Sequence, residues 1–79
     1  MGNSVMDTVY DRLIDLERKH KMNDRQLAKL LGVPVTTLRG WLYNVRVPGS
    51  STLRTLELLE LIEQHAPRLY RDLIDAAMS

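Results

Sequence analysis

The sequence contains no cysteine, so neither a disulfide framework nor a cysteine-based zinc site is available to it. It has no apolar run near the ~18 residues that a membrane-spanning helix requires, and its first residues, MGNSVM, lack the apolar segment of a secretory signal. Internal repeats and low-complexity stretches are also missing. We therefore expect a cytoplasmic protein without a membrane anchor, in which residues 1–79 form a single small domain.

Residue combinations that carry catalysis or bind metal ions are equally scarce. The two histidines, His20 and His65, are far apart and have no metal-ligand spacing, and no arrangement of serine, histidine and an acid is recognisable. The four glycines do not form a phosphate-binding loop. We therefore expect no enzyme activity, no cofactor and no metal site, and we expect both histidines to lie near helix ends.

Apolar residues recur at the spacing of α-helices through most of the chain. The pattern predicts an all-α fold of five helices, at about residues 4–19, 24–31, 35–43, 51–64 and 67–77. Pro48 and Gly49 separate the third helix from the fourth, and Pro67 suits the first turn of the fifth. The fourth helix carries more leucines than one face can use. We expect the core to cover one side of it, and another element to cover the side of Leu58 and Leu61.

Residues 23–44 carry the most specific pattern, two short helices joined by a tight turn. Asn23 can cap the first of these helices, and Gln26 stands three residues later, where a capping box needs it. Gly32 can end that helix in the left-handed conformation, and Pro34, which is tolerated only in a first helical turn, opens the second. The turn is therefore about three residues long, as in a helix-turn-helix.

The net charge of +1 conceals an uneven distribution along the chain. Residues 1–17 carry a net charge of −3 and residues 47–79 one of −2, whereas residues 18–46 carry +6. In that middle segment a single acidic residue, Asp24, opposes seven basic ones: Arg18, Lys19, Lys21, Arg25, Lys29, Arg39 and Arg46. Positive charge thus coincides with the two short helices, as a phosphate-binding surface requires, although an ordinary solvated basic surface has the same pattern.

The two short helices resemble the helix-turn-helix of the lambda repressor and Cro-like (Xre) family of DNA-binding proteins. The resemblance covers about residues 23–62 and depends on Ala28, Gly32, Leu38, Trp41, Asn44 and Pro48. At the position of Asn44 the family commonly has glycine, and asparagine is the next best residue for a left-handed helix end. It implies a prokaryotic or phage protein that binds double-stranded DNA, with the start of the second short helix as its base-reading segment. Asp24 stands where relatives often carry a glutamine near the phosphates, and its carboxylate would repel DNA, so that contact is not carried over.

The second short helix is expected to bury its apolar stripe, which leaves its other faces to DNA. Arg39 is expected to read a base, because its planar guanidinium can donate to O6 and N7 of guanine together. Thr36 is expected to bond to a base edge or a phosphate, and Val35 to touch a thymine methyl group. Gly40 indicates either close approach to DNA or tight packing on a neighbouring helix, because glycine inside a helix costs roughly 1 kcal/mol relative to alanine. Further phosphate contacts are expected from Arg25, Tyr43, Asn44 and Arg46.

The last helix carries a second apolar stripe, which a chain this short is expected to hide against a copy of itself. We expect helix 67–77 to form a homodimer through Tyr70, Ile74 and Met78, since helix-turn-helix proteins commonly dimerise to bind the two half-sites of an inverted repeat. The alternative is that these side chains complete the core of the monomer. The function we expect is that of a dimeric repressor that acts by occupying a promoter.

Two other functions fit the same residues. The tail from Pro48 onward resembles the end of the DNA-binding part of some antitoxins of the HigA and MqsA type, which implies a small toxin protein as a further partner. Phage-borne regulators, including anti-CRISPR-associated repressors, have comparable size. The other alternative is a protein-binding module that keeps the fold without binding DNA, and that uses the apolar surface of the fourth and fifth helices.

Overall fold

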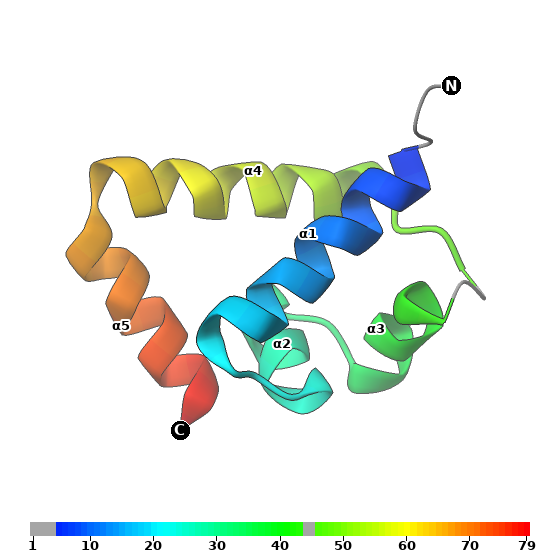
Figure 1. Cartoon of the computed structure of the whole chain (residues 1–79), viewed down its shortest axis with the longest axis horizontal. Coiled ribbons are helices and arrows are strands. Elements are labelled where there is room, and N and C mark those ends of the chain that lie inside the picture. Colours follow the sequence, from blue (N-terminus) through cyan, green and yellow to red (C-terminus); the bar gives the residue numbers. More distant parts are fainter. Residues whose placement is uncertain (1–4, 44–45) are drawn as a thin grey trace.

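All regular structure in the computed structural model, which describes residues 5–43 and 46–79, is helical (Figure 1). The described residues form five helices: α1 (Val5–His20), α2 (Asp24–Leu31), α3 (Val35–Leu42), α4 (Ser50–His65) and α5 (Pro67–Met78). The predicted all-α fold is therefore confirmed, and the helix ends within the described residues lie within one residue of their predicted positions. The predicted start of the first helix, at residue 4, lies outside the described residues. None of the helices described is long and apolar enough to cross a membrane.

α2 packs against three other helices, α1, α3 and α5. In Figure 1, α4 runs along one edge of the molecule, and α2 and α3 lie toward the opposite edge. α5 folds back from the end of α4 and packs against both α4 and α2. Two bonds connect α2 to the end of α5: Gln26 Nε2 donates to the carbonyl oxygen of Met78 at 3.4 Å, and Lys29 Nζ donates to that of Ser79 at 3.3 Å. α2 is therefore connected to α5 by these bonds, and α3 packs against α2.

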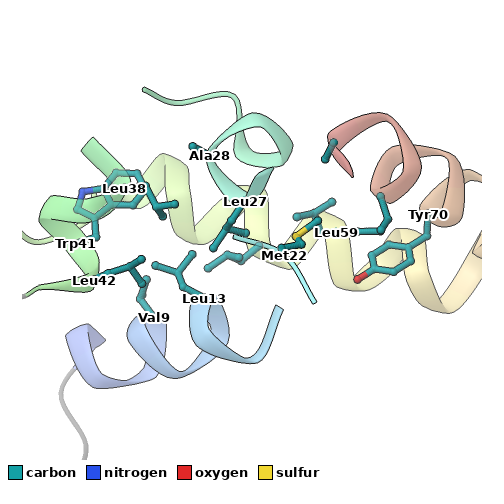
Figure 2. Close-up of a cluster of buried hydrophobic side chains, with 13 residues drawn as sticks. Val9, Leu13, Met22, Leu27, Ala28, Leu38, Trp41, Leu42, Leu59 and Tyr70 are labelled. Atoms are coloured by element: carbon teal, nitrogen blue, oxygen red, sulfur yellow. The ribbon is translucent and has the colours of Figure 1, made fainter. Parts of the chain in front are cut away.

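One cluster of buried side chains includes residues from all five helices (Figure 2). Leu13 of α1, Leu27 of α2 and Leu38 of α3 have no exposed surface, and burial of such a side chain stabilises the fold by roughly 1.5–3 kcal/mol. Trp41 and Leu42 of α3 are also buried in this cluster. Three large apolar side chains thus anchor α3, and its opposite face is left at the surface.

The ends of α2 are set by the residues that the sequence pattern indicated. Asn23 Oδ1 accepts from the N–H of Gln26, and Gln26 Oε1 accepts from the N–H of Asn23, both at 2.9 Å, which completes the capping box. Gly32 ends α2 in the left-handed conformation, with φ at +73°. Pro34 is extended and lies directly before α3, whose first turn begins at Val35 rather than at the proline, and no side chain caps it.

Replacing Gly32 by alanine is expected to lower the free energy of unfolding by about 1–2 kcal/mol, because a residue with a Cβ atom is strained in the left-handed conformation. The space around Gly32 is open within 4 Å, so a steric clash does not contribute to this loss. Gly40→Ala is the matched control, since Gly40 lies inside α3, and there alanine is expected to stabilise by up to ~1 kcal/mol. Urea unfolding of both variants measures the two effects. Equal changes of the same sign would contradict the prediction.

One side of α4 remains uncovered by the rest of the described chain. Leu58 and Leu61 are 44% and 48% exposed, whereas Leu56 and Leu59 are 2% and 7% exposed. The expectation that another element covers Leu58 and Leu61 is therefore wrong for the described residues, because the other helices pack on the side of Leu56 and Leu59. Leu69 of α5 is also half exposed.

Candidate functional site

The face of α3 that points away from the core carries residues predicted to read bases. Thr36 and Arg39 are exposed there, whereas Val35 is half-buried and packs against the core. Tyr43, directly after α3, is 66% exposed. The structure thus leaves Thr36, Arg39 and Tyr43 accessible to a partner, and gives Val35 less surface with which to contact one.

A shallow hollow lies on this face and is lined by Thr36, Thr37, Arg39, Gly40, Tyr43 and Arg46. Arg46 is held beside α3 by a bond from its N–H to the carbonyl oxygen of Gly40, at 3.1 Å. A Cβ atom at residue 40 would stand 3.5 Å from Arg46 Cδ, which is an ordinary contact, and the nearest atoms all belong to Arg46. Tight packing on a neighbouring helix therefore does not explain Gly40.

Arg39 also borders a second hollow, whose other residues are Asn23, Asp24 and Arg25 at the beginning of α2. Arg39 Nε donates to Asp24 Oδ2 at 3.3 Å. The side chain of Arg39 nevertheless keeps 48% of its surface exposed, and that of Asp24 keeps 23%. The guanidinium of Arg39 thus links the first turn of α2 to the outer face of α3 while it remains accessible to solvent.

A second carboxyl group, that of Glu17 near the end of α1, lies close to Asp24. Burial, and to a smaller extent the neighbouring Asp24 carboxylate, raises the pKa of Glu17 from 4.5 to about 7. Its Oε2 atom is buried and has no hydrogen-bond partner among the described residues, so ionisation is disfavoured there. The charge beside the first turn of α2 therefore changes near neutral pH.

The variant Glu17→Gln is expected to be more stable than the native chain at pH 8, by on the order of 1 kcal/mol after allowance for partial solvation, and about equally stable at pH 5. A carboxyl whose pKa is raised on folding holds its proton more tightly in the folded state. Its contribution to stability is therefore greatest below pH 4.5 and is lost as the pH rises through about 7. Urea unfolding at the two pH values measures the difference.

Two comparisons make this pH experiment specific to Glu17. Burial lowers the pKa of His20, so the contribution of His20 makes the fold more stable as the pH rises, opposite to that of Glu17. This contribution is the same in the native chain and in Glu17→Gln at a given pH, so it cancels in the comparison. Glu57→Gln removes the same charge from an exposed position on α4 and is expected to change stability little at either pH. A Glu17→Gln chain with the pH dependence of the native chain would contradict the prediction.

The basic segment 18–46 is divided by the tertiary structure. Lys19 forms an ion pair with Glu63 of α4, and Lys29 is bound to the end of α5. The basic residues that line the two hollows are Arg25, Arg39 and Arg46. Positive charge on the α2–α3 face thus depends on three arginines. Asn44, which was also predicted to contact a phosphate, lies outside the described residues.

The residues predicted to contact a second copy are mostly used within the monomer. Tyr70 and Ile74 are 7% and 8% exposed, and Met78 is half-buried and packs against the core. Tyr70 Oη lies 2.8 Å from His20 Nε2, a bond that connects α5 to the end of α1. These side chains complete the monomer core, which is the alternative that the sequence left open, and they offer little surface to a partner.

The two histidines lie at the ends of α1 and α4, as expected from the sequence. His20 is occupied by its bond to Tyr70, and the two rings lie 5.5 Å apart. Within residues 5–43 and 46–79, no group of three or more His, Cys, Asp or Glu side chains is placed to hold a metal ion.

The chain matches no family model, no curated protein and no solved structure. The function of the chain is therefore inferred from the surface formed by α2 and α3.

The contact between Asp24 and Arg39 on that surface was not predicted from the sequence, because no spacing rule links side chains on two different helices. The sequence did offer one indication of this contact, namely an acidic residue in the first turn of one predicted helix and a basic residue in the middle of the next.

Proposed function

We propose that the chain is a sequence-specific regulator that binds double-stranded DNA, with α2, the turn and α3 acting as a helix-turn-helix and α3 entering the major groove. The observation that carries the proposal is the position of Arg39. Its side chain is half exposed on the outer face of a short helix whose inner face is buried by three large apolar side chains. A major groove accepts one such helix, and a guanidinium on it can donate two bonds to guanine.

The residues on either side of Arg39 support the same function. Arg25 lies in the first turn of α2, where its charge and the free N–H groups of the helix can act together on a phosphate. Arg46 and Tyr43 line the hollow along α3 on the other side of Arg39. Phosphate contacts at both places would fix the orientation of α3 on the duplex, and Thr36 and Arg39 would then contact bases.

We propose that the protein is cytoplasmic and represses transcription as a homodimer that occupies an inverted-repeat operator. Occupancy needs no surface beyond the DNA-binding face, and two copies would place two recognition helices about one DNA turn, or ~34 Å, apart. Because Tyr70 and Ile74 are buried in the monomer, the dimer would use exposed apolar side chains of α4 and α5 such as Leu58, Leu61 and Leu69. Light scattering at micromolar concentration tests this state, and a strict monomer counts against the dimer.

Selection of bound oligonucleotides from a random duplex pool is the experiment that tests DNA recognition. We expect enrichment of inverted repeats that contain guanine. We also expect the affinity for the enriched site to fall with salt, with a slope of about −0.9 for each phosphate neutralised. A pool without enrichment, together with an affinity that does not depend on salt, would overturn the proposal.

A protein partner is the second candidate function, and the exposed leucines of α4 favour it. Leu58 and Leu61 lie on a helix face that the described chain leaves open, and a contiguous apolar surface is typical of protein interfaces. An antitoxin would combine this surface with DNA binding, and co-purification of a small protein would support that function. A module that binds only proteins would show no salt-dependent DNA affinity, and Arg39→Ala would leave its behaviour unchanged.

A further inference from the structure

The contact between Arg39 and Asp24 uses only one side of the guanidinium. The donor is Nε, which lies 3.3 Å from Asp24 Oδ2. Among the described residues, the two terminal nitrogens of Arg39, Nη1 and Nη2, have no hydrogen-bond partner. These are the two donors with which a guanidinium forms a bidentate, end-on contact to O6 and N7 of guanine.

Asp24 is itself held in place by the beginning of α2. It directly follows Asn23, whose capping box closes the first turn with two bonds of 2.9 Å. Its side chain is 23% exposed, whereas that of Arg39 is 48% exposed, so Asp24 is the more buried partner of the pair. The first turn of a helix is also a favourable place for a negative charge.

We propose that Asp24 is a positioning residue for Arg39, which holds Nε against the first turn of α2 and directs the two Nη groups toward a guanine in the major groove. This inference rests on the proposed DNA-binding function. Arginine has several rotatable bonds, and ordering such a side chain on binding has an entropic cost that a preformed contact reduces. Asp24 therefore increases sequence discrimination, although its carboxylate repels the DNA backbone and weakens binding to any sequence.

Loss of the Asp24 carboxylate is expected to change specific and non-specific DNA binding in opposite directions, which a purely structural role of Asp24 would not do. Asp24→Ala is expected to reduce the preference for the selected site, over the same site with its guanine pair replaced, by about 2- to 10-fold. It is expected to increase affinity for unrelated DNA, because one negative charge near the phosphates is removed. Asp24→Asn, which keeps an oxygen that can accept from Nε, is expected to retain part of the preference.

A double-mutant cycle tests whether Asp24 acts through Arg39. The native chain, Asp24→Ala, Arg39→Ala and the double variant are titrated with both DNA sites by fluorescence anisotropy, and urea unfolding confirms that each chain is folded. We expect Asp24→Ala to cause no further loss of preference once Arg39 is alanine. Asp72→Ala, which removes an exposed charge from α5, is expected to leave the preference unchanged.

The possible results of these titrations distinguish a failure of this inference from a failure of the proposed function. An Asp24→Ala chain that keeps or gains preference would overturn the inference alone, because the carboxylate would then withhold the guanidinium from DNA. An equal loss with and without Arg39 would also overturn it, because Asp24 would act through another group. A native chain that prefers no DNA sequence would overturn the proposed function, and the positioning role would fail with it.

Discussion

Replacing Arg39 by alanine is expected to reduce the preference of the protein for its selected DNA site by about 5- to 150-fold, which corresponds to about 1–3 kcal/mol. The loss should be concentrated at one base pair, because a guanidinium that donates to both O6 and N7 recognises guanine and none of the other bases. Fluorescence anisotropy titrations of the selected site, and of sites in which each base pair is replaced in turn, measure the effect.

Two further variants show whether the preference for the selected site depends on the planar, two-donor geometry of the Arg39 guanidinium or on positive charge alone. Arg39→Lys keeps the positive charge but cannot donate in the same bidentate geometry, so we expect a similar loss of preference with little change in salt dependence. Arg54→Ala removes an arginine from α4 that is 70% exposed and that, within the part of the chain described, pairs with Glu57 alone, and it should leave DNA binding unchanged. Full preference in the Arg39→Ala chain would show that α3 does not read DNA through this residue.

Replacing Leu38 by alanine is expected to lower the free energy of unfolding by about 2–5 kcal/mol. Leu38 has no exposed surface and is the most deeply buried of the three side chains that anchor α3. Truncation removes apolar contacts of Leu38 and leaves a cavity in the buried cluster to which this side chain belongs. A domain of this size has a total stability of roughly 4–12 kcal/mol, so this one change should remove a large part of it. Urea unfolding measures the loss.

Leu58→Ala is the matched control when unfolding is measured at a protein concentration at which the chain is monomeric, because it removes the same atoms from a helix position that is 44% exposed in the monomer. We expect it to lower the free energy of unfolding by less than about 1 kcal/mol. DNA affinity should follow stability in the Leu38 variant and recover at temperatures low enough to keep it folded, because Leu38 itself does not reach the surface. Similar losses of stability in the two variants would contradict the burial of α3 against the core.

Local interactions explain why the helix ends could be predicted from the sequence. The capping box of Asn23 and Gln26 spans three residues, and the left-handed end at Gly32 depends on the absence of a side chain at one position. The buried face of α3 follows from apolar residues at intervals of three and four. None of these features requires knowledge of which helices meet.

Contacts between helices explain what could not be predicted. Asp24 and Arg39 are 15 residues apart, and their contact depends on how α2 and α3 pack. Glu17 approaches Asp24 from a third helix, and its pKa is raised by burial that no sequence pattern records. In the same way, Lys29 belongs to the basic segment but is bound to the end of α5, which removes it from the candidate DNA-binding face.

The sequence by itself determined the helical character of the chain, the approximate bounds of its helices, and the three apolar residues of α3 that face inward; it did not determine that Val35 also packs against the core. These properties depend on the period of the α-helix and on bonds between residues close in the chain. Only the tertiary structure decided that Tyr70 and Ile74 belong to the monomer core, that Leu58 and Leu61 remain exposed, and that Asp24 contacts Arg39. The physical reason is that an apolar stripe specifies burial but does not specify the helix that provides it, and an ion pair between helices exists only where their packing brings the charges together.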